Sequence, residues 1–235
     1  TQPVRGAGRV GAGASCATTD LSATSSTVLQ RTEGPGNGAF PFWSPAGLRS
    51  EGAIASTSRH ADAGSRQLGS ENQTVRRKVW GAYWASGRLH SCTNTPDRNY
   101  QGAIGDFWDG FFAATRKGAR ILDLATGNGA LPLRIHRTLE GRARVDAIDL
   151  AALSPAWYEP ARHTEIRFHA GIGMEELPFE DAMFDEVVSQ FGFEYADRPR
   201  ALSEALRVAA PGARLAFVMH HAESVLVDVG REELG

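Results

Sequence analysis

The stretch ILDLATGNGAL at residues 121–131 is the part of the sequence from which the rest is interpreted. It opens with an apolar run, interrupted only by Asp123, that is typical of a short buried strand. A turn follows, in which Gly127 and Gly129 allow backbone to approach a ligand closely. A helical pattern then begins, and Pro132 is tolerated in its first turn. Free N–H groups at such a helix start bind a carboxylate or phosphate.

Strands and helices alternate from this turn onward. Strands are predicted at 120–124, 143–148, 165–169, 186–189 and 215–219, and helices at 131–139 and from about Asp197 to Pro211. Asp197 is a capping residue, and Pro199 stands just inside the second of these helices. The alternation predicts an α/β fold with a parallel sheet and right-handed crossovers.

The chain divides into three regions. About half of residues 1–75 are Gly, Ala, Ser or Thr without a sustained apolar period, so we expect a low-complexity, disordered tail. Residues 76–116 are rich in aromatic side chains, and we interpret them as a helical lid. Within them a short helix is expected at 79–88. The spacing of Ile104, Phe107, Trp108, Phe111 and Phe112 marks one face of a second helix. Residues 117–235 form the α/β domain.

Charge and composition exclude several classes of protein. The 25 basic and 27 acidic side chains leave a net charge of -2, which disfavours nucleic acid and anionic membranes as partners. No apolar run approaches the roughly 18–20 residues of a membrane span. Cys16 and Cys92 form no metal-ligand pair, so we expect no metal site and a cytoplasmic location.

Two ligand classes use a strand, glycine turn and helix of this kind. The dinucleotide fingerprint requires a third glycine at position 132, where this chain has Pro132, so a nicotinamide enzyme is disfavoured. Asp149 ends the second predicted strand, where an acid accepts hydrogen bonds from ribose hydroxyls. The structural alternatives are that Asp123 only caps the turn and that Asp149 is a solvated strand end.

Three motifs in this order and spacing resemble class I S-adenosylmethionine-dependent methyltransferases. They are the turn at 123–129, the segment LPFEDAMFDEVVSQ at 177–190 and the segment RVAAPGARL at 207–215. The resemblance covers residues from about 80 to 221 and is greatest to the ubiquinone- and menaquinone-type branch that acts on small molecules. It implies a Rossmann-like doubly wound sheet of strand order 3-2-1-4-5, S-adenosyl-L-methionine as the cofactor, and methyl transfer to a small-molecule acceptor.

The resemblance also implies roles for individual residues. Asp123 would orient the turn and the cofactor's amino group, Asp149 would hold the ribose, and Met174 would pack on the adenine. Gly173 stands where the family commonly has an acid that accepts the adenine amino group. The expected cofactor-binding residues are Asp123, Ala125, Thr126, Gly127, Asn128, Gly129, Asp149, Leu150, Met174 and Gln190.

The catalytic residues are not identified by the sequence. Methyl transfer depends mainly on alignment, and a general base is needed only if the acceptor loses a proton. Candidates after the fourth and fifth strands are Gln190, Glu194 and His220. An aromatic wall that stabilises the sulfonium cation is expected from Tyr83, Trp84, Tyr100, Phe191 and Phe193.

The resemblance implies two further strands after the fifth, one of them antiparallel and beside it. Only 16 residues follow Met219, so we expect a C-terminally incomplete sheet in which 215–219 is an exposed edge. Such an edge favours self-association. The alternative function is a truncated, non-catalytic S-adenosylmethionine-binding module or an inactive remnant of the same fold.

Overall fold

The computed structural model describes residues 24–30, 61–91 and 98–220. Within them, a single sheet has the strand order β1-β6-β5-β2-β3-β4. Its strands are β1 (Thr24–Gln30), β2 (Arg120–Leu124), β3 (Arg144–Asp149), β4 (Ile166–Ala170), β5 (Phe184–Gln190) and β6 (Ala209–His220). Strands β2 to β6 run parallel to their neighbours, and β1 runs antiparallel to β6. The five predicted strands therefore lie in the order 3-2-1-4-5, as expected.

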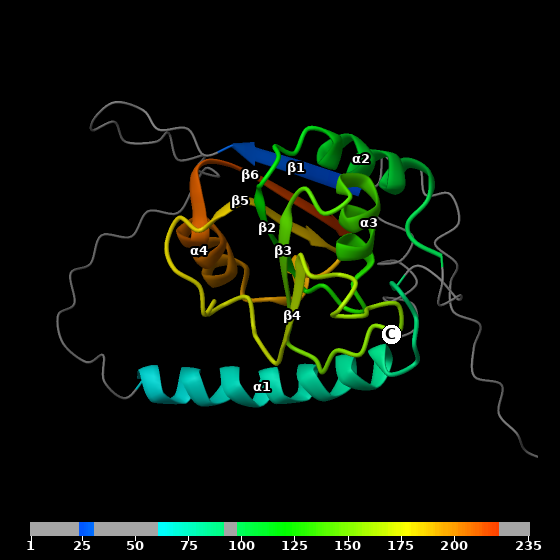
Figure 1. Cartoon of the computed structure of the whole chain (residues 1–235). Coiled ribbons are helices and arrows are strands. Elements are labelled where there is room, and N and C mark those ends of the chain that lie inside the picture. The colour runs from blue at the N-terminus through cyan, green and yellow to red at the C-terminus, as the bar shows by residue number, and fades with distance from the viewer. Residues whose placement is uncertain (1–23, 31–60, 92–97, 221–235) are drawn as a thin grey trace, which may run out of the picture.

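Helices cover both faces of the sheet. They are α1 (Ala61–Trp84), α2 (Gly102–Ala113), α3 (Ala130–Leu139), α4 (Arg198–Val208) and the short 3₁₀ helix η2 (Phe193–Tyr195). Helices α2 and α3 lie on one face and α4 lies on the other, whereas α1 runs past the edge of these layers (Figure 1). No helix in the described ranges combines the length and apolar character that a membrane span requires.

The strands contribute alternate side chains to two cores. Ile121 and Val145 pack with α2 and α3, whereas Leu122 and Ile148 pack with α4. Successive side chains of a strand point to opposite faces, so strands buried on both faces are apolar at most positions. This explains why the predicted strands are mainly apolar and do not alternate between apolar and polar residues.

Helix α4 follows its sequence signals closely. Asp197 is its N-cap, and the Asp197 side chain accepts a hydrogen bond from the backbone N–H of Arg200. Pro199 lies in the first turn, where its missing N–H has no intrahelical acceptor. The helix ends at Val208, and β6 begins at the next residue.

Helix α2 is part of the core layer, which partly corrects the expectation that residues 76–116 are all lid. Trp108 and Phe112 of the predicted apolar face are fully buried. The Arg134 guanidinium of α3 also binds both carboxylate oxygens of Asp109, at 2.7 and 2.9 Å. The apolar face of α2 is wide enough to require burial against the sheet. Helix α2 therefore cannot move to close over a ligand.

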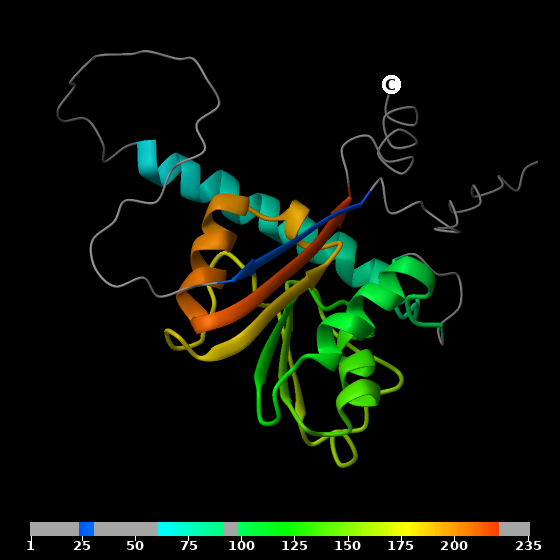
Figure 2. The same cartoon turned by 90° about the horizontal axis from the view of Figure 1, so that it is seen from above.

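Strand β1 corrects two expectations. It lies in the segment expected to be disordered, and it pairs with β6 from Thr24↔His220 to Gln30↔Arg214. Figure 2 shows β1 running alongside β6 at the edge of the sheet. An antiparallel strand was expected beside residues 215–219 from the sequence that follows them, and β1 takes that place from the N-terminal part of the chain. The edge at 215–219 is therefore paired, which removes the basis for self-association through it. Backbone hydrogen bonds pair strands without an apolar period, which is why composition concealed β1.

Helix α1 is the other element in the segment expected to be disordered. It begins at Ala61, well before the predicted start at 79, and ends at Trp84. Both cysteines and the segment 221–235 lie outside the described residues.

Candidate functional site

A cavity of about 1140 Å³, its open mouth included, lies at the carboxyl ends of the parallel strands. Loops after β2, β3, β4 and β5 line it from the sheet side. The end of α1 and residues 89–91 line it from the other side. Open α/β sheets bind ligands at this end, because the loops diverge there on either side of the first strand.

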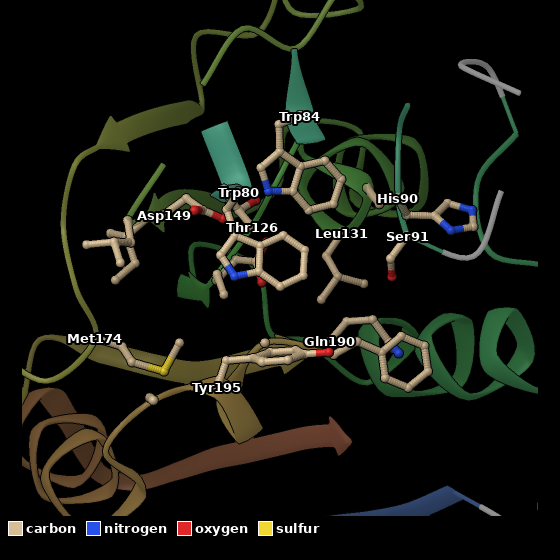
Figure 3. Close-up of a pocket in the computed structure, with 18 of the residues that line it drawn as sticks. Trp80, Trp84, His90, Ser91, Thr126, Leu131, Asp149, Met174, Gln190 and Tyr195 are labelled. Carbon is tan, nitrogen blue, oxygen red and sulfur yellow. The ribbon is translucent and has the colours of Figure 1, made fainter. Parts of the chain in front are cut away.

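The residues labelled in Figure 3 surround this cavity and come from segments far apart in the chain. Of the expected cofactor-binding residues, the cavity is lined by Asp123, Ala125, Thr126, Asp149, Leu150, Met174 and Gln190. Gly127, Asn128 and Gly129 are not among the lining residues.

The three residues of the turn instead hold other segments in place. A Cβ on Gly127 would lie 2.5 Å from the Trp84 ring, so this indole lies directly against the turn. A Cβ on Gly129 would lie 2.7 Å from the Phe168 ring. The Asn128 side-chain amide donates hydrogen bonds to the carbonyl oxygens of Trp84, at 3.0 Å, and Arg88, at 2.6 Å. The turn therefore anchors the end of α1 over the cavity.

Asp149 links the tips of β2 and β3. Its carboxylate accepts hydrogen bonds from the backbone N–H groups of Gly127 and Ala151, both at 2.8 Å. Each of these oxygens can accept a further bond, because a carboxylate has about four acceptor positions. Burial raises the pKa of Asp149. The two strand tips thus face the same cavity, as the sequence predicted, and Asp149 is not a solvated strand end.

Asp123 is enclosed more completely. Its pKa is raised to about 8, mainly by burial; the adjacent Thr126 side chain lowers the pKa and the nearby Asp149 carboxylate raises it. Asp123 Oδ2 and Thr126 Oγ1 are buried and have no hydrogen-bond partner among the described residues. Buried polar atoms are nearly always paired, so this pair of atoms at a cavity indicates a polar ligand.

Gln190 presents a third polar atom of this kind. The buried Trp108 indole donates a hydrogen bond of 2.5 Å to Gln190 Oε1. Gln190 Nε2 is buried and has no partner in the described part of the chain. The bond from Trp108 therefore orients the amide so that its N–H donors remain for the cavity.

His220 and Glu194 form a pair beside the cavity. His220 Nδ1 lies 2.8 Å from Glu194 Oε1, and the His220 backbone N–H donates to the same oxygen at 3.2 Å. Phe191 stacks on the His220 ring at a centroid distance of 4.1 Å. His220 lines the cavity, whereas Glu194 is not among the lining residues.

Aromatic side chains line the cavity from both sides. Trp84, Tyr100 and Phe191 line it as expected, and Phe191 comes from the loop after β5. Phe193 does not, because its ring stacks on Phe217 in the core at 4.5 Å. Tyr83 is not a lining residue either, and its ring meets Trp84 edge-on at 5.0 Å.

Sequence reasoning missed several lining residues. Trp80 stacks on Trp84 at 6.1 Å and meets Tyr195 edge-on at 5.2 Å. The i, i+4 spacing of Trp80 and Trp84 was the available signal for a shared helix face. His90 stacks on Tyr100 at 3.9 Å, and burial lowers its pKa to about 4, so its ring is neutral at pH 7. No local pattern marked His90 or Tyr195.

The unpartnered atoms of the cavity fit S-adenosylmethionine. A carboxylate accepts hydrogen bonds from ribose hydroxyls, and an amide N–H donates to a carboxylate. Without a ligand, Asp123 holds its proton at pH 7, and the positive charge of an ammonium group would lower its pKa and favour the carboxylate that accepts hydrogen bonds from it. Leu150, Ile172 and Met174 supply an apolar surface for a base. No group of side chains able to hold a metal ion occurs among the described residues. A parallel sheet with acids after its first two strands and such a cavity defines a nucleoside-binding α/β domain.

Comparisons with known proteins agree with this class. Residues 121–212 match the family described as "Methyltransferase domain". The demethylmenaquinone methyltransferase of Thermus thermophilus is 45% identical over 101 residues, which cover 41% of this chain and 44% of that protein. The ubiquinone/menaquinone biosynthesis C-methyltransferase of Proteus mirabilis is 32% identical over 123 residues, covering 48% and 47%. The chain thus spans less than half the length of each relative.

A solved structure of a SAM-dependent methyltransferase from Aquifex aeolicus is 23% identical, with a TM-score of 0.43, over 49% of this chain and 63% of that one. The assignment depends on the sequence matches and on the geometry of the site. Residues 121–212 thus resemble a methyltransferase domain, and the two relatives named above are methyltransferases of demethylmenaquinone and of ubiquinone/menaquinone biosynthesis.

Proposed function

We propose that the chain binds S-adenosylmethionine in the cavity and transfers its methyl group to a small-molecule acceptor. The carrying observation is that Asp123 Oδ2, Thr126 Oγ1 and Gln190 Nε2 are buried at this cavity without partners among the described residues. Within a methyltransferase domain, these atoms match the amino and carboxylate groups of the cofactor's amino-acid part. The bound cofactor would supply an electrophilic methyl group on a positively charged sulfur.

Asp149 and its neighbours are proposed to hold the nucleoside. The Asp149 carboxylate is fixed by two backbone N–H groups, so little further ordering is needed when it accepts ribose hydroxyls. Leu150 and Met174 bound the adjoining apolar part of the cavity. Alignment of this kind accounts for most of the rate in a displacement reaction.

An aromatic, quinone-type acceptor is supported by the aromatic residues of the cavity. Trp80 packs on both Trp84 and Tyr195, and all three line the cavity. Flat aromatic rings stack favourably in such surroundings, and each pair adds roughly 0.5–1.5 kcal/mol beyond its buried area. The names of the relatives from Thermus and Proteus point to the same class of acceptor. The indole faces also stabilise a cation by roughly 0.5–2 kcal/mol.

His220 is the proposed base where the acceptor must lose a proton. Glu194 Oε1 engages Nδ1 of the ring, so Nε2 is the nitrogen that remains to take the proton. Stacking on Phe191 holds the ring plane. In this proposal Glu194 positions His220, and Gln190 contacts the cofactor rather than acting as a base.

Binding of S-adenosylhomocysteine, measured by calorimetry, tests the proposal. Thr126→Val removes the unpartnered hydroxyl at nearly constant volume, so the fold should keep its stability while binding weakens roughly 2- to 12-fold, the value of one hydrogen bond. The control is Thr164→Val, because Thr164 is exposed and lies outside this cavity. Equal weakening in both variants, or no binding by the unaltered chain, would refute the assignment of the cavity.

The activity itself requires a transfer assay. Methyl-labelled S-adenosylmethionine and a demethylated naphthoquinol are the reactants, and the expected result is label in the quinol. Binding without transfer to any acceptor in a broad screen would support the non-catalytic module instead. Tighter binding of NAD than of S-adenosylhomocysteine would support a nicotinamide enzyme.

A further inference from the structure

Strand β6 extends past the end of its parallel neighbour β5. The two strands pair as far as Gln190↔Val218, and the backbone N–H of Phe191 then donates a hydrogen bond of 2.8 Å to the Val218 carbonyl oxygen. Strand β6 continues to His220, the proposed base. The residue on which proton removal depends therefore lies beyond the part of β6 that the β5 ladder holds.

Strand β1 accompanies β6 to its end. The antiparallel register includes Ser25↔Met219 and Thr24↔His220, and Figure 2 shows the two strands side by side. On its other side His220 is held by a side chain, because its backbone N–H donates to Glu194 Oε1 at 3.2 Å. Among the described strands, β1 is thus the one that supports the main chain of β6 at the cavity.

The direction of the backbone groups shows which residue of β1 makes this contact. The Val218 carbonyl and the His220 N–H both point away from β1, since their hydrogen-bond partners follow β5 in the chain. Backbone groups alternate in direction along a strand, so those of Met219 point toward β1. Ser25↔Met219 is therefore a hydrogen-bonded pair, whereas the N–H of Ser26 faces the open edge of the sheet.

We propose that β1 is a positioning element for methyl transfer, because its pairing with Met219 fixes the place of His220 in the cavity. The inference rests on the proposed function, in which the His220 imidazole takes a proton from the acceptor. Glu194 fixes one ring nitrogen, at 2.8 Å, and so sets the orientation of the ring. The ladder to β1 sets the position of the main chain that carries the ring.

Proline substitutions in β1 test this role, because proline has no N–H to donate. Ser25→Pro removes the bond to Met219. With an acceptor that must lose a proton, kcat should fall about tenfold to a hundredfold, as it does when a reacting group is slightly misplaced. The affinity for S-adenosylhomocysteine, measured by calorimetry, should stay the same, because Asp123, Asp149 and Gln190 lie on other strands.

Two matched variants separate this contact from a general effect of proline. Ser26→Pro changes the adjacent residue, whose N–H faces the open edge, where strands accept proline. Leu29→Pro removes the same kind of bond at the other end of β1, at Leu29↔Leu215, where β5 also pairs with β6 through Val187. Both variants should keep the kcat of the unaltered chain.

Hydrogen exchange of the Met219 amide adds a readout that requires no activity. Exchange should be faster in Ser25→Pro than in the unaltered chain, and Leu29→Pro should leave it unchanged. Unchanged exchange in Ser25→Pro, an unchanged kcat in that variant, or an equal fall of kcat in Leu29→Pro would overturn the inference. No transfer by the unaltered chain would overturn the proposed function instead, and the exchange comparison would then decide whether β1 holds this end of β6.

Discussion

The proton on Asp123 provides a quantitative test of how completely the site is enclosed. The side chain is buried to 1% exposure, and burial raises its pKa from 3.8 to about 8. Between these two pH values the folded chain binds the proton and the unfolded chain has lost it. The free energy of unfolding therefore falls as pH rises from about 4 to about 8, and levels off above that.

The magnitude follows from the proton linkage. Each pH unit within the window is worth about 1.4 kcal/mol, so raising the pH from 5 to 7 should cost about 2.7 kcal/mol through Asp123 alone. Asp123→Asn removes this titration, and taking the difference between the two proteins cancels the other groups to first order. Urea unfolding at pH 5, 6 and 7 measures this difference.

Asp109→Asn is the control. Asp109 is exposed, and its hydrogen bond to Arg134 lowers its pKa. Its stabilising effect is complete above the unfolded pKa and is lost only as pH falls below it, so the Asp109→Asn difference should be flat from pH 5 to 7. A flat difference for Asp123→Asn as well would show that Asp123 is ionised in the folded chain, and the reasoning from its burial would fail.

Two further predictions concern the supports of the site. Trp108→Phe removes the hydrogen bond to Gln190 and should lower the free energy of unfolding by about 1–3 kcal/mol. The same change made in a Gln190→Leu background should cost about 1 kcal/mol less, and equal costs would contradict the coupling. Gly129→Ala should cost about 2–5 kcal/mol, from its φ of 79° and from contact with Phe168. Gly141→Ala, at φ 75° with open space around it, should cost only about 1–2 kcal/mol, and a similar loss in both would refute the packing argument.

Elements stabilised by neighbouring residues were predictable from the sequence. The strand at Arg120–Leu124 has the predicted bounds, and α4 begins after its predicted cap at Asp197. The apolar period of α2 correctly identified its buried face, although it did not distinguish a lid from a core layer. A periodic pattern shows that a face is buried and does not show what buries it.

The site also has a part that was predictable from the sequence and a part that was not. Asp123 and Asp149 lie at the ends of neighbouring parallel strands, so the sheet topology places them at the same edge. The inward positions of Trp80, His90 and Tyr195 did not, because they depend on where α1 and the loops before α2 and after β5 come to rest. Glu175 is a further case, since it lines the cavity beside Arg76 although the two residues are far apart in the sequence.

By itself, the sequence determined the parallel sheet and the acids at two strand tips, since these depend on local periodicity, caps and chain connectivity; the strand order came from the resemblance to a known family. The tertiary structure alone decided that β1 covers β6, that Trp84 covers Gly127 and that Glu175 lines the cavity beside Arg76. Each of those contacts joins segments whose separation in sequence carries no pattern, and each forms only once the sheet has brought its surfaces together.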